Sequence, residues 1–441
     1  MINNCKKTIV NINPKTLIDN NPLSGLQIGT ILICFLMNLL DGMDILIISY
    51  AAPAIATDWN IKPAALGTVF SAGLFGMTIG TLFLAPYADK IGRKTIIVIS
   101  GAIMGTCIYI TSYTTNITEL LLCRFVSGLG IGSMLASTAS LVAEYTPNKT
   151  RDFWVSLIIA GYPVGAVLSG LVAAKVIPLD GWQQMFKIAG IASMFSVPLT
   201  LLFLSESIDY YTRTQPKGAL KKINKILKKM NFDGIDALPK IEKLKSAIPI
   251  DQLLKTAYLK PTLQLWVALF MAFASLYFLT SWIPKLAKDA GLSMELSIYA
   301  GTIFNLGAFF GIVTQGYLSS KFGLKKTLGT ILVLTGLLMA SFGLFIGSDW
   351  ILFILALLGF GIQGGFVGLY ALSARLYPTQ FRTTGIGWSM GAGRIGGMVG
   401  PYIAGLLIAG GIGIGLNFII FAIPAIVSGI VTSKIDSDQI S

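Results

Sequence analysis

Long apolar runs separated by short polar segments make up most of the chain. Twelve of these runs are about 20 residues long, the length that crosses a bilayer as a helix. They lie near residues 26–50, 64–86, 95–113, 119–142, 154–175, 184–204, 262–283, 297–318, 327–347, 351–372, 384–408 and 412–432. A polar segment, 205–261, divides them into two sets of six. We therefore predict an all-α membrane protein with twelve transmembrane helices in two halves, 26–204 and 262–432, between a polar N-terminal segment, 1–25, and a short tail, 433–441.

The composition and the placement of charge support this prediction. Only 12% of the 441 residues are charged, which is far less than in a soluble domain of this size. Of the 33 lysines and arginines, 26 lie in the N-terminal segment, the loops after even-numbered runs and the tail, whereas five lie in the opposite loops. Basic loops stay in the cytoplasm, so we predict cytoplasmic N- and C-termini. The net charge of +13 then reports membrane topology and gives no reason to expect nucleic acid as a partner.

The two sets of six runs resemble each other at an offset of 231 residues. The loop 85–94 reads A-P-Y-A-D-K-I-G-R-K, and the loop 316–325 reads G-Y-L-S-S-K-F-G-L-K. Arg151 recurs at the same offset as Arg382. Duplicated, pseudo-symmetric halves are a transporter design in which the substrate site lies between the halves, near the middle of the membrane.

Two acids lie in the middle of the first apolar run. Asp41 and Asp44 are three residues apart, which places both on one face of a helix. Charged groups at this depth are costly and usually mark a functional pathway, although fixed salt bridges are an alternative. Gly42 lies between the acids and would let another backbone approach closely. The chain has no histidine, so proton coupling would have to use carboxylates, and we assign it to Asp41 and Asp44.

Each half also carries one arginine within an apolar run. Arg124 lies in the fourth run and Arg394 in the eleventh. A guanidinium stays charged and can bind a carboxylate through two hydrogen bonds. We therefore expect both arginines, together with Asp41 and Asp44, to form a binding site for a small organic anion. The alternative is that one arginine is structural; the G-R-I-G-G setting of Arg394 is also compatible with close helix packing.

Four further intramembrane residues are candidates for substrate contact. Asn305 and Gln363 lie near the middle of the eighth and tenth runs, where amides can also simply join helices to one another. Tyr162 and Trp388 lie in glycine-rich stretches and are our candidates for stacking on a ring. Anchoring at the membrane interface is the common alternative for such side chains.

Charged residues of the repeated loops and nearby helix ends are candidates for a gate. These gating residues are Asp89, Gly92, Arg93, Arg151 and Arg382. Exposed ion pairs are worth about 0–1 kcal/mol each, which suits contacts that must break and re-form. Glu144, near the end of the fourth run, is a third acid for proton coupling. The alternative is that these charges only set the orientation of the helices.

The polar segment 205–261 contains five lysines between residues 221 and 229, interleaved with apolar residues at helical spacing. This pattern predicts an amphipathic basic helix at the cytoplasmic membrane surface. A binding site for a partner protein is the less favoured interpretation of the same charges.

Several motifs together resemble those of a known family. The loop with Asp89, Gly92 and Arg93 resembles the signature loop of the major facilitator superfamily. The segment 41–44 and the run 377–401 are similar to the aromatic acid:proton symporter branch. The resemblance implies a monomeric transporter in a bacterial inner membrane that imports small aromatic carboxylates, such as benzoate or hydroxybenzoate, by alternating access. It also implies that the proton gradient drives transport without a metal or other cofactor.

Other functions stay open at this point. Within the transporter class, the substrate could be nicotinate, a sugar acid or a similar anion, or the protein could be an efflux antiporter. A membrane receptor or a membrane-embedded enzyme is a further alternative. The sequence has no G-x-x-x-x-G-K-[ST] loop for nucleotide phosphates and no nucleophile or metal cluster, so we expect a transporter and not an enzyme.

Overall fold

In a computed structural model, residues 14–239, 256–377 and 382–435 are described, and every regular element among them is a helix. The N-terminal half contains α2 (Gly25–Asp58), α3 (Pro63–Ile79), α5 (Arg93–Thr111), α6 (Ile117–Tyr145), α7 (Arg151–Ile159), α8 (Gly161–Asp180) and α9 (Trp182–Phe203). The C-terminal half contains α12 (Thr256–Asp289), α13 (Met294–Phe322), α14 (Leu324–Ala340), α15 (Ile351–Leu376), α16 (Arg382–Ala409) and α17 (Ile414–Ser433). Short helices flank them: α1 (Pro14–Asp19), α4 (Ala88–Ile91), α10 (Ile208–Thr214) and α11 (Ala219–Lys229).

The predicted helical membrane architecture is confirmed. Within the described residues, eleven helical segments are long and apolar enough to cross a membrane. The remaining predicted run, 327–347, forms α14 and then a 3-10 turn at Phe342–Phe345. The 17 residues of α14 rise about 26 Å, somewhat less than the roughly 30 Å of a hydrocarbon core. The 3-10 turn extends this element further, so the twelfth run is also compatible with a membrane span.

Two of the predicted runs are less regular than the hydropathy pattern suggests. The second run continues from α3 through a π-helical turn, Gly80–Leu84, and a 3-10 turn, Ala85–Tyr87. The fifth run divides at Ala160 into α7 and α8. Pro163 explains this division, because its ring lacks an N–H and collides with the carbonyl four residues earlier, at Ile159, in a regular helix.

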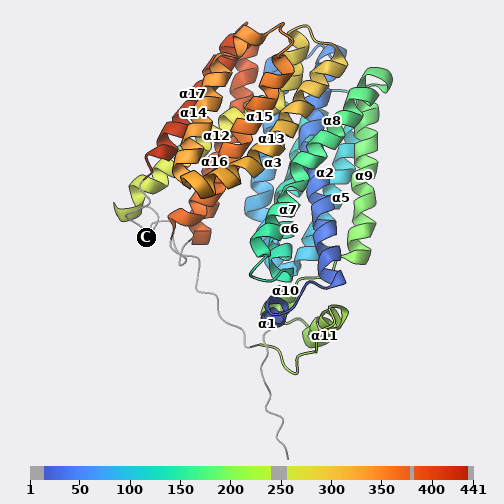
Figure 1. Cartoon of the computed structure of the whole chain (residues 1–441). Helices are drawn as coiled ribbons and strands as arrows, with labels where there is room; N and C mark the ends of the chain where they lie inside the picture. Colours follow the sequence, from blue (N-terminus) through green and yellow to red (C-terminus); the bar gives the residue numbers. More distant parts are fainter. Residues whose placement is uncertain (1–13, 240–255, 378–381, 436–441) are drawn as a thin grey trace, which may run out of the picture.

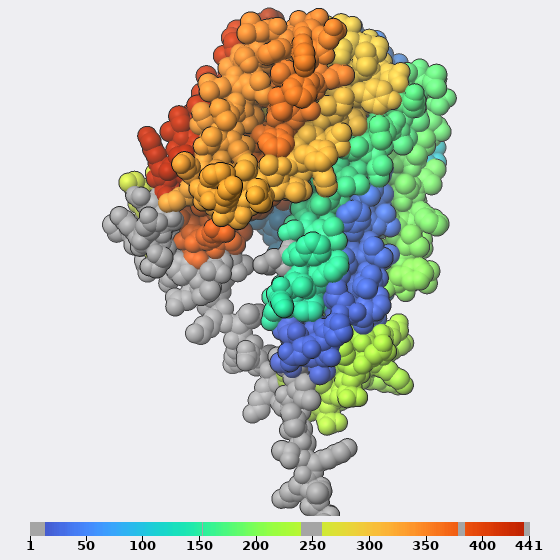
Figure 2. Space-filling model, viewed as in Figure 1, coloured from blue at the N-terminus to red at the C-terminus, as the bar shows by residue number. Residues whose placement is uncertain are grey.

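The two halves lie side by side and are in contact at one end of the bundle (Figure 1). Helix α3 packs on α16, and α8 packs on α13. The hydrogen bonds and the ion pair between described residues of the two halves include Ser71 Oγ donating to the Met398 carbonyl at 2.7 Å, and Lys175 with Glu295 at 3.3 Å. We call this the closed end. The opposite end carries α1, α10 and α11, and is called the α11 end; the two lobes separate toward it (Figure 2).

Glycine allows the helices of the N-terminal half to approach closely around the acidic pair. A Cβ atom added to Gly42 would lie 2.0 Å from the carbonyl oxygen of Tyr162 on α8. This confirms the prediction that Gly42 admits another backbone beside Asp41 and Asp44. The same surface of α2 therefore positions the acids and packs against α8.

We expect Gly42→Ala to destabilise the protein, because the added methyl group must push α8 away from α2. Overpacking of this kind costs about 1–3 kcal/mol. Thermal unfolding in detergent measures the effect, and Gly29→Ala on the same helix is the matched control, since nothing lies within 4 Å of its added Cβ. Equal melting temperatures for the two variants would contradict the close approach.

The predicted amphipathic helix is present as α11, but its apolar side is covered by the protein. Ile223 and Leu227 are fully buried, whereas the lysines of α11 are exposed. The side chain of Asn224 accepts the backbone N–H of Ile235 at 2.9 Å and donates to its carbonyl at 3.0 Å. The chain after α11 thus folds back over the helix. The amphipathic pattern is explained by this packing, and contact with a membrane surface stays a prediction.

Candidate functional site

A buried ion pair joins α2 and α6 in the middle of the N-terminal half. Arg124 Nη1 donates to Asp44 Oδ1 at 2.9 Å and to the Asp44 carbonyl at 3.2 Å. The Arg124 side chain is only 4% exposed, and its guanidinium lies 5.6 Å from the ring centre of Phe186 on α9. Within the described residues, Nε and Nη2 of Arg124 and Oδ2 of Asp44 have no hydrogen-bond partner. The pair is therefore held by one side-chain hydrogen bond and enclosed by protein.

Asp41 lies one helical turn before Asp44 and has a different environment. Its side chain is buried, and no hydrogen bond joins its Oδ1 to the described residues. Its carboxyl group interacts electrostatically with Asp44 on the same helix and with Arg394 in the opposite half. Asp41 thus faces the C-terminal half, whereas Asp44 is bound within its own half.

Arg394 on α16 is the intramembrane arginine of the C-terminal half, and it forms no ion pair with a described acid. Its side chain is half-buried, and no ion pair or hydrogen bond joins it to any described residue. The glycines around it pack α16 on α12, since a Cβ atom at Gly396 would lie 2.0 Å from the Phe270 carbonyl oxygen. The G-R-I-G-G segment therefore combines the two alternatives: its glycines allow close packing of α16 on α12, and its arginine lines a pocket.

Two adjoining pockets between the halves contain the arginines. A space of about 490 Å³ is lined by Arg124 and other residues of the N-terminal half, and by Tyr277, Thr280 and Ser281 of α12. A smaller space of about 160 Å³ is lined by Arg394 and Phe273. Leu74 and Tyr277 line both. Asp41, Asp44, Arg124 and Arg394, which the sequence predicts to converge, thus lie around one central region.

The two predicted amides differ in their surroundings. Asn305 is buried and donates to the Gly301 carbonyl of its own helix at 2.8 Å, beside Tyr50 at the contact between α13 and α2. Gln363 lies on α15 three residues before Phe366, which contacts Phe273 of the smaller pocket. Residues at this spacing share a helix face. Gln363 is thus buried on the face of α15 that carries Phe366 and is not among the residues that line the central pockets, whereas Asn305 belongs to the interface of the halves.

The two predicted aromatic residues lie outside the central pockets as the structure describes them. Tyr162 is half-buried on α8, where its backbone contacts Gly42 and its side chain lies in electrostatic range of Asp41. Trp388 is 50% exposed and stacks on Trp266, with ring centres 6.3 Å apart. The aromatic residues that line the pockets are different ones.

Sequence reasoning missed most of this aromatic wall. Phe273 and Tyr277 lie one turn apart on α12 and stack with ring centres 5.9 Å apart. Phe366 meets Phe273 edge to face at 4.6 Å, and Tyr370 meets Phe366 at 5.2 Å. The sequence shows that the two rings of each pair are four residues apart. It does not show that the pair on α12 packs against the pair on α15.

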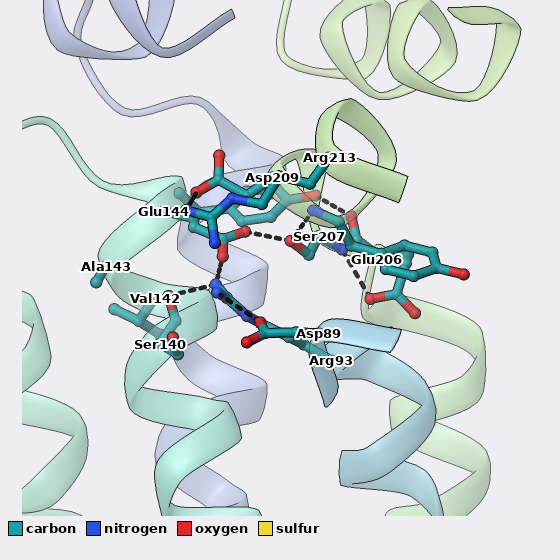
Figure 3. A network of polar contacts seen from close by, with 12 residues as sticks. Asp89, Arg93, Ser140, Val142, Ala143, Glu144, Glu206, Ser207, Asp209 and Arg213 are labelled. Atoms are coloured by element: carbon teal, nitrogen blue, oxygen red, sulfur yellow. Dashed lines mark hydrogen bonds and ion pairs between the residues drawn. The ribbon is translucent and has the colours of Figure 1, made fainter. Parts of the chain in front are cut away.

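A second polar network lies at the α11 end of the N-terminal half (Figure 3). Arg93 is 3.6 Å from Asp89 and forms an ion pair with Glu144. Glu144 also accepts a hydrogen bond from the Ser207 hydroxyl. Asp89 is 63% exposed and is thus accessible to a further contact. Glu144 lies with the gating residues here, at the end of α6, and not with Asp41 and Asp44.

Glu206 is a member of this network that the sequence did not reveal. Its carboxylate accepts the backbone N–H of Lys94 at 2.9 Å, in the first turn of α5. An acid at a helix N-terminus is favourable because unpaired N–H groups gather there. Gly92 precedes this turn with φ +104°, a conformation that favours glycine. The loop before α5 is therefore held by a glycine and by an acid from the far end of the half.

The remaining predicted gating residues lie where α7 and α16 begin. Arg151 donates to Asn148, whose side chain in turn donates to Asp19 of α1 at 2.6 Å. Lys15 of α1 donates to carbonyl oxygens at the end of α6, including that of Thr146 at 2.9 Å. Burial lowers the pKa of Lys15, and nearby Arg151 lowers it further. Arg382 begins α16, but its side chain lies outside the described part of the structure.

Comparison with known proteins agrees with this architecture. The chain is 33% identical over 407 residues to the 4-hydroxybenzoate transporter PcaK of Pseudomonas aeruginosa, covering 91% of this chain and 90% of that protein. It is 31% identical to the benzoate transport protein of Acinetobacter baylyi, covering 97% and 93%, and 28% identical to the niacin transporter NiaP of the same species, covering 88% of each.

The fold is also shared with a solved transporter. The inward-open xylose transporter XylE from E. coli superposes with a TM-score of 0.72 at 15% identity, covering 93% of this chain and 96% of that one. The sequence profile of the Major Facilitator Superfamily matches residues 34–316 and 299–437. The family and these relatives are transporters and not enzymes. The chain is thus a multi-pass membrane protein that belongs to the major facilitator superfamily.

Proposed function

We propose that this protein imports small aromatic monocarboxylates together with protons by alternating access. The observation that carries the proposal is the unpaired Arg394, which faces a pocket walled by aromatic rings and lies opposite the buried acid Asp41. A fixed cation attracts a carboxylate, and the rings suit a planar, apolar body. Relatives named as transporters of 4-hydroxybenzoate and benzoate support the same substrate class.

The coupling mechanism follows from the two acids having different partners. The ion pair with Arg124 favours the ionised form of Asp44. An ionised Asp41 would be costly unless Arg394 balanced it, because it is buried without a hydrogen-bond donor at Oδ1. A proton taken up by Asp41 from outside therefore frees Arg394 to bind the substrate carboxylate. When substrate leaves inside, Asp41 loses its proton and its negative charge again balances Arg394.

Alternating access then requires that the two halves rock about the central site. Because the lysine-rich α11 end is predicted to be cytoplasmic, the cleft that widens toward it represents an inward-facing state. We expect the bodies 26–204 and 262–432 to move in a bacterial inner membrane, joined by the segment 205–261, in a monomer. Asp89, Arg93 and Glu144 would exchange partners as the α11 end closes, and no cofactor takes part.

We expect Asp89→Asn to lower the turnover number several-fold while the dissociation constant of the substrate stays within about twofold. Asp89 is 63% exposed, although Arg93 is largely buried, so we expect solvent to limit the worth of their pair to about 1 kcal/mol, and neither residue lines a central pocket. Its loss should act on the rate at which the halves change state. Single-turnover exchange in proteoliposomes and equilibrium binding separate the two quantities.

The control for this variant is Asp289→Asn, which removes the exposed acid of another i,i+4 pair, with half-buried Lys285, at the closed end. It should change neither quantity. If Asp89→Asn weakened binding in a folded protein, or left turnover unchanged, the gating role would be wrong.

Transport by the purified protein tests the proposed function directly. Labelled benzoate and 4-hydroxybenzoate should accumulate in proteoliposomes when the outside is acidic, and a protonophore should abolish the accumulation. Nicotinate belongs in the same assay, because one relative is named a niacin transporter and nicotinate is also an aromatic monocarboxylate. Uptake that is equal with and without the pH gradient would contradict proton coupling. Absence of uptake for all three anions, with a sugar acid or another anion transported instead, would contradict the substrate class.

A further inference from the structure

We propose that three adjacent parts of the C-terminal half recognise a hydroxylated aromatic carboxylate: Arg394 binds the carboxylate, Tyr277 and Phe273 hold the ring, and the hydroxyl groups of Thr280 and Ser281 bind a ring hydroxyl opposite the carboxylate. This inference rests on the proposed function and deepens it, because it names the substrate subclass and the residues that select it.

The carboxylate subsite follows from which arginine is available. Arg124 lines the larger pocket but is already bound to Asp44, and its side chain is only 4% exposed, with Nε and Nη2 buried. Arg394 is half-buried and lines the smaller pocket, and it forms no hydrogen bond or ion pair with a described residue. An anion that binds Arg394 therefore breaks no existing ion pair, whereas one that binds Arg124 must compete with Asp44.

The ring subsite follows from the stacked pair on α12. Phe273 and Tyr277 are nearly parallel, with an interplanar angle of 20°, and both line the pocket of Arg394. Gly397 lies against them, because a Cβ atom there would be 2.9 Å from Tyr277 Cδ2. Phe366 meets Phe273 edge to face, with ring centres 4.6 Å apart. Aromatic contacts between rings fixed in this way contribute about 0.5–1.5 kcal/mol beyond burial.

The hydroxyl subsite is the observation that the proposed function did not use. The side chains of Thr280 and Ser281 are only 6% and 7% exposed, and both line the larger pocket. Their backbone carbonyls accept the Ser49 hydroxyl at 2.8 and 2.9 Å, yet no hydrogen bond joins either of their own hydroxyls to a described residue. Neither hydroxyl oxygen is among the fully enclosed polar atoms that lack a partner, so both keep some surface in the pocket and can bind a polar ligand group or water there.

The order of these residues along α12 sets the orientation of the substrate. Tyr277 lines both pockets, and Ser281 lies four residues further along, about 6 Å along the helix axis toward the closed end. The carboxylate at Arg394 and a hydroxyl at Thr280 or Ser281 would therefore lie at opposite positions of one ring, beside Tyr277. A hydroxyl next to the carboxylate would not reach these side chains.

The test compares ligands that differ only in the ring hydroxyl. Binding of 4-hydroxybenzoate, benzoate and 2-hydroxybenzoate to the purified full-length protein is measured by calorimetry for the double variant Thr280→Val/Ser281→Ala. We expect the dissociation constant of 4-hydroxybenzoate to rise about 10-fold, since its hydroxyl loses its partners. The constants of benzoate and 2-hydroxybenzoate should stay within about twofold. Ser281→Ala alone, a smaller change, should give a smaller rise with the same selectivity.

Three further variants keep the result interpretable. Ser341→Ala, at the end of α14 and outside both pockets, controls for loss of a serine hydroxyl and should change no constant. Tyr277→Leu should weaken benzoate about 10-fold but leave cyclohexanecarboxylate unchanged, and the lipid-facing Phe310→Leu should affect neither. Equal losses for 4-hydroxybenzoate and benzoate, or no loss for either, would overturn the hydroxyl subsite. A wild-type protein that binds none of these acids would instead overturn the proposed function itself.

Discussion

Replacing Arg394 with glutamine is expected to raise the dissociation constants of benzoate and 4-hydroxybenzoate about 100-fold or more. The guanidinium is the only described cation that lines the central pockets without an acid bound to it. Loss of a charge-assisted, two-pronged contact in a partly desolvated site costs about 3 kcal/mol, which corresponds to roughly 100-fold. Arg394→Lys keeps the charge but not the forked geometry, so we expect an intermediate loss of about 10-fold.

The same substitution at the other arginine should give a different result. Arg124→Gln leaves Asp44 buried without its cation, which costs about 3–5 kcal/mol of folding stability. The double variant Arg124→Gln/Asp44→Asn removes both charges and should recover most of that stability. Thermal unfolding and calorimetric binding, measured on all four proteins, separate the two roles. The assignment fails if Arg394→Gln is unfolded while Arg124→Gln is stable and deficient in binding.

The sequence was informative where a charge had to be explained by its position in a membrane. Asp41, Asp44, Arg124 and Arg394 could be singled out because each is costly in an apolar span, and the structure places all four around the same region. The twelve apolar runs could also be recognised as candidate transmembrane helices, because a helix that spans the membrane must be long and apolar. What the pattern left open was the pairing: either acid was a reasonable partner for either arginine, and only packing of α6 on α2 decides that Arg124 holds Asp44.

The aromatic wall and Glu206 were not predictable for a related reason. The chain has 25 phenylalanines and 15 tyrosines, most of them in spans that are apolar on every side. Such a helix carries little information on which face meets the cleft. Glu206 acts through a helix start more than a hundred residues away in the sequence, so its role needs the fold. The division of the fifth run before Pro163, in contrast, could have been predicted from the sequence, because proline commonly interrupts a helix.

Asp41→Asn is expected to abolish accumulation of substrate driven by a pH gradient while exchange of substrate across the membrane continues. Asparagine resembles the protonated form of Asp41, so Arg394 stays free for the carboxylate and binding survives. Without a group that gains and loses the proton, the gradient no longer acts on the transport cycle. Exchange by this variant should also become independent of pH, because the titrating group has been removed.

Three comparisons test this assignment of the proton to Asp41. Asp44→Asn should also abolish accumulation, but by leaving Arg124 buried without its acid, and it should therefore lower the melting temperature, which Asp41→Asn should not. Asp58→Asn, at the end of the same helix, can still accept the Trp182 Nε1 hydrogen bond and should transport normally. If Asp41→Asn accumulates substrate as the wild type does, or loses exchange as well as accumulation in a folded protein, the proton is carried elsewhere and Asp41 serves another purpose. The outcome depends on one physical point. Asp41 is buried and interacts with Arg394 without a hydrogen bond, so it should gain and lose a proton more readily than Asp44, which is held in an ion pair with Arg124.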